Sequence, residues 1–383
     1  MSRPTKTKRS FQLESLESRE LLTAGGPSAE AQYMLTLLNQ ARTNPQAAAT
    51  EFTTNLTPDV QTTLQYYNVD LNQVRAAISS AAPRQPLAWN ANLAASATAQ
   101  SQYQANTGVQ THLGADGSAP YQRMDQAGYT NRVSSGENAY AYSQSVDNAM
   151  EAFMIDWGVS SLGHRNNILQ PTATPQTSYQ AVGIGIVKTN TPNFGPEVIT
   201  QDFGAQSGYT AQLLGVAYYD KNGDGSYSMG EGQGNVQIQA VNLATGQTSS
   251  VFTWDAGGGY QLPLTPGTYQ ITASVGSRVF STQTVTMGTQ NVEVDFNLSQ
   301  PWLSDTNPAA AQQALGIQTP VVAAQNLNPP TPITPQTQVS IPSTQQQQQQ
   351  PVTVSYGNNT PVAPAQAAQS NSWFSWGSKW FNS

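Results

Sequence analysis

The sequence predicts an α/β fold and an all-β domain, followed by a disordered C-terminal tail. Residues 29–206 mix helix-period and strand-period patterns, and residues 210–298 alternate apolar with polar positions. Residues 299–383 carry 11 of the 24 prolines and little charge. We therefore expect a layered α/β domain, then an all-β sandwich, then a segment without a core.

Helix signals recur through residues 29–206. The segment "PSAEAQYMLTLLNQARTNP" begins at the N-cap candidate Ser28 and ends at Asn44-Pro45, because a residue before proline resists helical geometry. The segment "NANLAASATAQSQYQANTG" predicts a second helix that Gly108 ends. A third helix follows in "DNAMEAFMIDWG", and "AVGIGIVKT" and "EVITQDFG" are expected to be adjacent strands.

Residues 210–298 show the period of two that is typical of strands. Two inward-facing sets are predicted: Tyr269, Ile271, Ala273 and Val275, and then Val292, Val294, Phe296 and Leu298. The segments "DAGGGY" and "LTPGTY" supply turns between strands. Short strands at this spacing indicate a sandwich.

Composition excludes several classes of function. The net charge is −7, and four of the 15 basic residues lie in the first nine positions. The rest of the chain is therefore more acidic still, which argues against nucleic acid as a partner. The chain has no cysteine, which excludes disulfides, thiolate metal sites and a cysteine nucleophile. No run approaches the ~20 apolar residues of a membrane helix, so no transmembrane segment is predicted.

Residues 1–26 are interpreted as an export or sorting signal. The segment lacks the continuous apolar core of a conventional signal peptide. It resembles the N-terminal segment of many bacterial surface and exported proteins at Phe11, Leu13, Glu14, Leu16, Glu17, Arg19, Leu21, Leu22 and Ala24. The alternative interpretation is a disordered, charged arm.

Residues 299–383 are expected to be disordered, because their composition buries too little apolar surface to offset chain entropy. The region contains the glutamine run 345–350 and ends in the aromatic cluster "WFSWGSKWF". That cluster is typical of a tail that anchors the protein to a surface or docks on a partner. The equal alternative is an adhesive apolar end without a functional role.

The chain has two histidines, His112 and His164, and two acidic residues accompany them, Glu137 and Asp156. Imidazoles and carboxylates together suit Zn²⁺ or another divalent cation. The four positions are spread from 112 to 164, so they form no compact metal motif. The alternative is that the imidazoles hydrogen-bond Glu137 and fix loops without a metal.

Seven short motifs occur in order: "LLNQARTNP", "LAWNANLAASATAQSQYQ", "THLGADG", "GENAY", "GHRNNIL", "VGIGI" and "TQDFG". Together they resemble the CAP superfamily of cysteine-rich secretory, venom-antigen and plant pathogenesis-related proteins, and most closely its cysteine-free bacterial branch. The resemblance implies an α-β-α sandwich with a central cleft. There, two histidines and two acids, His112, Glu137, His164 and Asp156, can bind a cation.

Two departures from the family pattern concern this region. Phe153 stands where the family has a tryptophan, which makes Asp156 the least certain member of the four. Residues 54–84 are an insertion, for which we expect an extra helical flap beside the cleft. Asn138 and Asn166 are candidates to brace the loops, and Arg165 is expected to serve packing or a surface ion pair.

The leading hypothesis is a secreted or cell-surface binding module whose cleft takes an extracellular peptide, glycan or lipid, with a cell-surface component as a further partner. No nucleophile motif accompanies the resemblance, so we favour binding over catalysis. The alternative is a metal-dependent hydrolase, a protease or esterase, at the cell envelope. In it Glu137 would act as the base for a metal-bound water.

The segment "DKNGDGSYSMGE" predicts a calcium site. Gly225 stands at position 6 of an EF-hand-type loop, and the oxygen ligands stand at positions 1, 3, 5, 7, 9 and 12: Asp220, Asn222, Asp224, Ser226, Ser228 and Glu231. Its predicted flanking strands resemble the B-type, immunoglobulin-like repeats of bacterial surface adhesins. The expected cofactors are therefore calcium here and zinc in the cleft. The alternative for the loop is a plain acidic turn.

Overall fold

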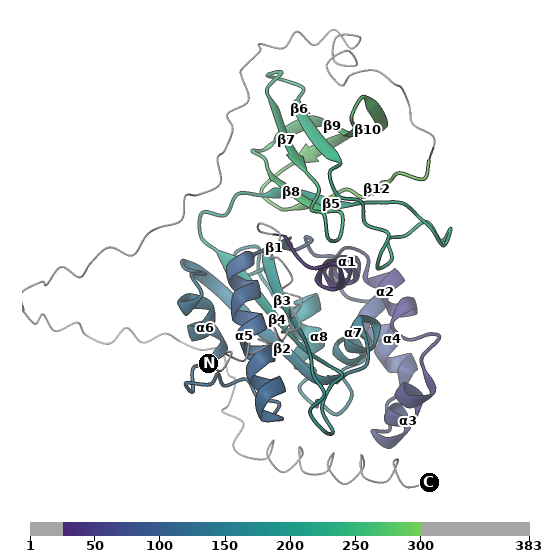
Figure 1. The fold of residues 1–383 in the computed structure, drawn as a ribbon, viewed down its shortest axis with the longest axis vertical. Coiled ribbons are helices and arrows are strands. Elements are labelled where there is room, and N and C mark those ends of the chain that lie inside the picture. Colours follow the sequence, from purple (N-terminus) through teal and green to yellow (C-terminus); the bar gives the residue numbers. More distant parts are fainter. Residues whose placement is uncertain (1–25, 301–383) are drawn as a thin grey trace, which may run out of the picture. The chain divides into compact units, whose positions relative to one another are not determined.

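The computed structural model describes residues 26–300 (Figure 1). The interpretations of residues 1–25 and 301–383, as sorting signal and disordered tail, lie outside these residues. Between residues 26 and 300, no helix has both the length and the apolar character to cross a membrane. We call residues 26–206 the α/β region and residues 210–300 the β region.

The α/β region consists of helices around a small sheet. The helices are α1 (Ala29–Thr43), α2 (Pro45–Glu51), α3 (Pro58–Tyr66), α4 (Leu71–Ser79), α5 (Ala91–Thr107), α6 (Pro120–Gln126), α7 (Val146–Ile155) and α8 (Gly163–Leu169). The strands are β1 (Ala88–Trp89), β2 (Arg132–Ser143), β3 (Ala181–Lys188) and β4 (Glu197–Gln206). They form a four-stranded sheet in the order β1-β3-β4-β2, with β1 parallel to β3 and the other pairs antiparallel.

Helices pack on both faces of this sheet. Helix α5 contacts β3 and β4 on one face, and α1, α7 and α8 lie over the other (Figure 1). The approach of α5 is close, because a Cβ added at Gly183 would lie 1.9 Å from the backbone nitrogen of Ala94, and one at Gly185 would lie 2.3 Å from that of Thr98. The glycines of "VGIGI" therefore serve the contact between helix and strand.

The predicted boundaries of the first two helices are confirmed. The Ser28 side chain accepts a hydrogen bond from the Ala31 nitrogen at 3.2 Å, and α1 ends at Thr43. Pro45 then begins α2, a position where the missing N–H of proline costs nothing. Helix α5 ends at Gly108, which adopts the left-handed conformation at φ 66°.

The insertion at residues 54–84 is helical, as expected. It contains α3 and α4, and α4 packs against α2 and against α7. Val74 and Ile78 are the buried residues of α4. The insertion thus adds to the helical layer that includes α7.

The β region forms two sheets around one core. Its strands are β5 (Gln212–Tyr218), β6 (Gln237–Asn242), β7 (Thr248–Phe252), β8 (Gly259–Pro263), β9 (Gly267–Val275), β10 (Arg278–Met287), β11 (Val292–Glu293) and β12 (Phe296–Asn297). One sheet has the order β10-β9-β6-β7, and in the other β5 pairs with β8, β11 and β12. Ile238, Tyr260, Ile271 and Phe296 are buried together between them.

The predicted inward-facing set on β9 is correct with one exception. Tyr269, Ile271 and Ala273 are buried, but Val275 is 38% exposed. Val275 ends the strand and is followed by Gly276, which has a φ of 58°, so the chain turns before this side chain reaches the core.

Asn291 joins the two regions through hydrogen bonds. Its side-chain nitrogen donates to the carbonyls of Pro86 and Gln180 at 2.9 and 2.8 Å, and its backbone nitrogen donates to Gln85 Oε1 at 3.0 Å. Its Oδ1 accepts from the backbone nitrogen of Gln212 at 2.9 Å. Asn291 is 4% exposed, so these bonds form in a buried environment where each is costly to break.

Candidate functional site

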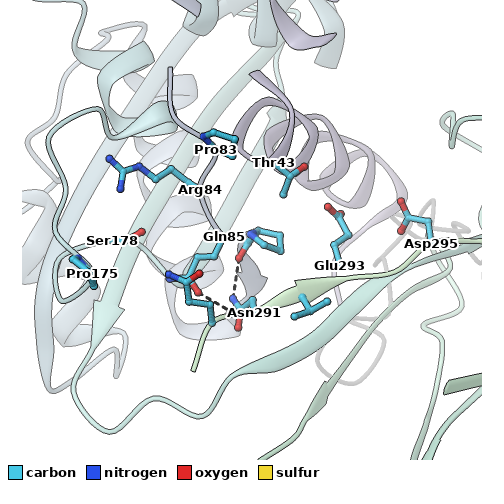
Figure 2. Close-up of a pocket in the computed structure, with 12 residues that line it drawn as sticks. Thr43, Pro83, Arg84, Gln85, Pro175, Ser178, Asn291, Glu293 and Asp295 are labelled. Carbon is cyan, nitrogen blue, oxygen red and sulfur yellow. Dashed lines mark hydrogen bonds between the residues drawn. The ribbon is translucent and has the colours of Figure 1, made fainter. Parts of the chain in front are cut away.

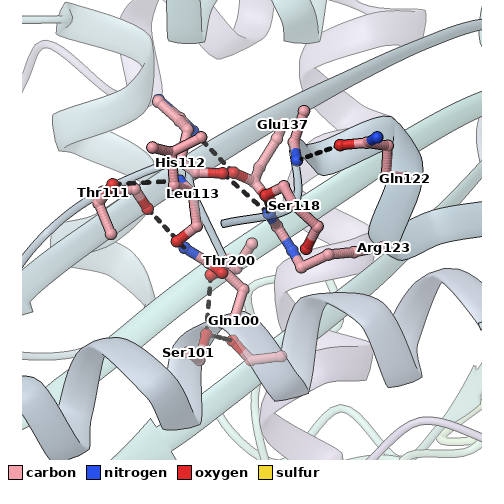
Figure 3. A network of polar contacts seen from close by, with 12 residues as sticks. Gln100, Ser101, Thr111, His112, Leu113, Ser118, Gln122, Arg123, Glu137 and Thr200 are labelled. Atoms are coloured by element: carbon pink, nitrogen blue, oxygen red, sulfur yellow. Dashed lines mark hydrogen bonds and ion pairs between the residues drawn. The ribbon is translucent and has the colours of Figure 1, made fainter. Parts of the chain in front are cut away.

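Glu137 is the centre of the first cluster of predicted site residues. It lies on β2 opposite Asp202 of β4, and its side chain is 1% exposed. Its Oε1 lies 2.7 Å from His112 Nδ1, while the His112 side chain is 49% exposed (Figure 3). A buried carboxylate thus orients a half-exposed imidazole.

Arg123, on α6, holds both members of this pair. One guanidinium nitrogen donates to Glu137 Oε2, and the other donates to the carbonyls of His112 at 2.8 Å and Ser118 at 3.0 Å (Figure 3). Arg123 is only 7% exposed, and its charge offsets the buried charge of Glu137. Sequence analysis missed this residue, because "YQRMDQ" gives no sign of which carboxylate the arginine meets.

Helix α5 supports the loop that carries His112. Gln100 Nε2 donates to the carbonyls of Thr111 at 2.6 Å and Leu113 at 3.3 Å (Figure 3). Gln104 Oε1 accepts from the backbone nitrogen of Thr111 at 3.2 Å. Both glutamines are fully buried, so the loop is fixed by polar groups shielded from water.

His164 and Asp156 form the second pair. His164 Nδ1 lies 2.8 Å from Asp156 Oδ1, and Asp156 Oδ2 accepts from the backbone nitrogen of Arg165 at 3.1 Å. The Phe153 ring lies 5.2 Å from the His164 ring, centroid to centroid. Phe153, which stands where the resemblance led us to expect a tryptophan, thus packs beside this histidine.

The placement of Asp156 on the third helix needs a correction. Helix α7 ends at Ile155, and Asp156 is its C-cap with a left-handed φ of 61°. This turn directs the carboxylate, which is fully buried, toward the start of α8. Asp156 therefore contacts His164 from the C-terminal end of α7 and not from a face of that helix.

Two asparagines connect the pairs. Asn138 Nδ2 donates to the His164 carbonyl at 3.3 Å, and Asn167 Nδ2 donates to the Glu137 carbonyl at 3.2 Å and to Asn138 Oδ1 at 2.9 Å. The bracing role predicted for Asn138 is thus confirmed. Asn166 instead donates to the Ser161 carbonyl at 3.2 Å and braces only the start of its own helix.

Of the two roles expected for Arg165, packing and a surface ion pair, the structure supports packing. Arg165 is 6% exposed and donates to the backbone carbonyls of Met154 and Ile155. Burial lowers the pKa of its guanidinium, while Asp156 opposes that shift. The residue satisfies the carbonyls at the C-terminus of α7, which is a structural role.

Asp202 adds a second carboxyl group beside Glu137. It is fully buried, and within the described residues neither of its oxygens has a hydrogen-bond partner at good geometry. Burial first, and then the negative charge of Glu137, raise the pKa of Asp202 well above its usual range. This environment therefore favours the neutral form of Asp202 more than water does.

The two histidine–carboxylate pairs share one arrangement. Each histidine has its Nδ1 on a carboxylate, so Nε2 is the ring nitrogen that the carboxylate does not contact. Both oxygens of Glu137 and of Asp156 are already engaged, so these acids orient the imidazoles from behind. Across residues 26–300 no three His, Asp or Glu side chains form a group able to hold a metal, and the cleft cation stays a prediction.

The predicted calcium loop lies between β5 and the bridge of Tyr218 with Gly232. Its first ligand position, Asp220, accepts from the backbone nitrogens of Gly223 at 2.7 Å and Gly225 at 3.0 Å. Its last, Glu231, is 4% exposed and accepts from the nitrogens of Lys221 and Ser228, both at 2.8 Å.

The intermediate positions of this loop also approach one another. Asn222 Nδ2 donates to Asp224 Oδ2 at 2.8 Å and to Ser228 Oγ at 3.2 Å. Ser226 takes part through its backbone nitrogen, which donates to Asp224 Oδ1 at 2.7 Å. The loop is therefore closed by its own acidic groups, and calcium binding remains a prediction.

Comparisons with known proteins bear on the α/β region. Residues 35–203 match the model of the CAP family, described as the cysteine-rich secretory protein family. No curated protein matches the sequence. The solved structures that match include an extracellular protein containing a SCP domain from Bacillus anthracis str. Ames, with a TM-score of 0.26 and 20% identity. That match covers 39% of this chain and 44% of the other, less than half of either.

The family match supports a CAP domain within this chain, and residues 35–203 include all four of the predicted cleft residues. The mixture of helices and strands in the α/β region is consistent with the α/β fold expected for that family.

Proposed function

We propose that this chain is a secreted, surface-associated protein whose CAP domain binds a divalent cation together with a peptide, glycan or lipid. The observation that carries the proposal is the pair of histidine–carboxylate contacts. His112 lies against Glu137 and His164 against Asp156, each through Nδ1. This is the geometry by which proteins present Nε2 to a metal ion.

Support for secretion comes from the family and from the N-terminus. The matched family is described as secretory. Residues 1–26 resemble the sorting segment of exported bacterial proteins, and the chain carries no cysteine that an oxidising compartment would oxidise. Fusion of residues 1–26 to a reporter tests this, with the appearance of the reporter outside the cell as the expected result. Retention of the reporter inside the cell would contradict the proposal.

Zinc titration of the purified full chain tests the cleft. Because the chain has two histidines and no cysteine, strong zinc sites elsewhere are not expected. We expect His112→Ala and His164→Ala each to abolish the binding measured by calorimetry. Asp59→Asn, an exposed acid on α3, serves as the control and should bind as the parent does. Equal zinc affinity in all variants would contradict the proposal that His112 and His164 bind the cation.

The same variants separate binding from hydrolysis. The proposal expects a ligand retained through purification and no turnover of peptide or ester libraries in the presence of zinc. Turnover that both His112→Ala and Glu137→Ala abolish would establish the hydrolase instead. In that case Glu137 would have to release Arg123 to act as a base, because both of its oxygens are engaged.

We further propose that the loop of residues 220–231 binds calcium and stabilises the β region as a B-type immunoglobulin-like domain. Its support is the closed loop, in which the carboxylates of Asp220, Asp224 and Glu231 each accept from backbone nitrogens of the loop and form no ion pair with a basic side chain within the described residues. A Ca²⁺ ion would offset the repulsion among these carboxylates.

Calcium dependence of unfolding tests this second site. We expect added calcium to raise the melting temperature of the parent and to leave that of Glu231→Gln unchanged. Asp255→Asn, outside the loop, is the control and should respond as the parent does. An unchanged melting temperature in the parent would contradict the proposal.

A further inference from the structure

A cavity lies where the two regions meet, away from the histidine pairs and the calcium loop. It has a volume of about 590 Å³, and its lining includes residues 83–86 of the α/β region and residues 290–293 and Asp295 of the β region (Figure 2). This volume is within the ~300–1,000 Å³ that is usual for ligand sites. Asn291 fixes the two walls through its buried bonds to Pro86 and Gln180, so the cavity is part of the fold.

Two carboxylates from the β region line this cavity. Glu293 and Asp295 are two residues apart and lie on the same side of the segment in Figure 2. Asp295 Oδ1 accepts from the backbone nitrogen of Val216 at 2.8 Å. In the described part of the chain, neither carboxylate forms an ion pair with a basic side chain.

The basic residue of the cavity does not compensate these charges. Arg84 donates to the backbone carbonyls of Ala173 at 3.1 Å and Pro171 at 3.2 Å. In Figure 2 its guanidinium lies on the opposite side of the cavity from Glu293 and Asp295. The cavity therefore has a negative end.

A small second cavity adjoins Glu293 and is lined by acceptors that lack donors. It holds about 10 Å³, and its walls include Gln32 from α1, Gln261 from β8 and Glu293. Gln32 is 3% exposed, and neither its Oε1 nor that of Gln261 receives a hydrogen bond within the described residues. Buried acceptors without donors are costly, so a bound group that donates would be stabilised here.

The surroundings of Glu293 and Asp295 raise the pKa values of both carboxyl groups. Burial first, and then the charge of Asp295, raise the pKa of Glu293 well above its usual range, against a hydrogen bond from Asn39. Atoms packed around the carboxyl group raise the pKa of Asp295 to about 6, although part of the residue is exposed to solvent. A bound cation would favour the charged forms and release protons.

We propose that this junction binds the primary ammonium group of a lysine-bearing peptide, with the ammonium at Glu293. An ammonium has three donors and no acceptor, which matches the acceptors of Glu293, Gln32 and Gln261. Glu293 lines both cavities, so an ammonium held at its carboxylate from the larger cavity would lie beside the small one, which has room for about one group of the size of water. The alkyl stem then lies along Pro86 and Val292 in the larger cavity, as lysine stems do on apolar surface.

Calorimetry on the full chain tests the proposal with two small probes. The first is Nα-acetyl-lysine N-methylamide, and the second is the uncharged norleucine analogue of nearly equal shape. We expect the lysine probe to bind and to release protons at pH 6, measured in two buffers of different ionisation enthalpy. Glu293→Gln and Gln32→Met should each weaken its binding by about tenfold or more, because both remove an acceptor for a charged donor.

The control variant is Asp59→Asn, which removes a carboxylate on α3 and should bind the lysine probe as the parent does. Circular dichroism confirms that each variant is folded. The proposal is overturned by no binding of the lysine probe, by equal binding of the norleucine analogue, or by unchanged affinity in Glu293→Gln. A Ca²⁺ or Mg²⁺ site at Glu293 that excludes the lysine probe would also overturn it.

Discussion

Arg123 and Glu137 form a buried ion pair that ties α6 to β2. The same arginine donates to the carbonyl of His112, whose ring contacts the other oxygen of Glu137. A buried arginine therefore helps to set the position of the half-exposed histidine, together with the buried glutamines that fix its loop. Any role of His112 in binding depends on this pair.

Replacement of Arg123 tests that dependence. Arg123→Met leaves the carboxylate of Glu137 buried without its arginine partner, and we expect it to lower the free energy of unfolding by about 3–5 kcal/mol. Urea denaturation followed by circular dichroism measures the loss. The double variant with Glu137→Gln removes both charges and should recover part of that loss. A double variant less stable than Arg123→Met would show that the ion pair is not the cause.

The contact of α5 with β3 predicts a strong effect at Gly183. A Cβ there would lie 1.9 Å from the Ala94 nitrogen, so Gly183→Ala must displace the helix. We expect a destabilisation of about 3 kcal/mol or more, or failure to fold. Gly288→Ala is the matched control, because its Cβ would meet no atom within 4 Å, and it should change stability by less than about 0.5 kcal/mol. Similar melting temperatures for both variants would contradict the close approach.

The left-handed conformation of Asp156 predicts a ranking of substitutions. Asp156→Gly and Asp156→Ala both lose the bonds to His164 and Arg165, but only alanine is strained at a φ of 61°. We expect Asp156→Gly to be more stable than Asp156→Ala by about 1 kcal/mol in chemical denaturation. The reverse order would show that α7 does not end as described.

Because of Glu293 and Asp295, we expect the junction of the two regions to contribute more to the free energy of unfolding in acidic conditions. The pKa values of both are raised in the folded protein, so their contribution is most favourable below the unfolded pKa and is lost as the pH rises through the folded pKa. For Asp295 that loss falls between about pH 4 and pH 6.

Glu293→Gln isolates this effect. We expect the variant to have a higher melting temperature than the parent at pH 8, because it removes a buried charge, and a similar one at pH 4, where the acid is neutral. Melting followed by calorimetry at the two pH values measures the difference. A variant less stable than the parent at pH 8 would show that the charged form of Glu293 is satisfied by a partner.

Local signals in the sequence were sufficient for most element boundaries and for the choice of candidate sites. Ser28, Pro45 and Gly108 act on their own turns of backbone, so the sequence alone identifies where α1 begins and ends and where α5 stops. The spacing of oxygen-bearing residues from Asp220 to Glu231 likewise lies within one loop. The scarcity of histidine was enough to single out His112 and His164.

Tertiary structure decided the partners of these groups. Arg123 meets Glu137 across 14 positions, and Asn291 meets Gln85 across 206. The sequence also could not show that Glu293 and Asp295 lack a basic partner, because the segments around them are distant in sequence. In the sequence these two acids are only the polar positions of an alternating strand. Backbone propensity acts over a few neighbouring residues, whereas the pairing of buried polar groups depends on which distant segments share one water-free space.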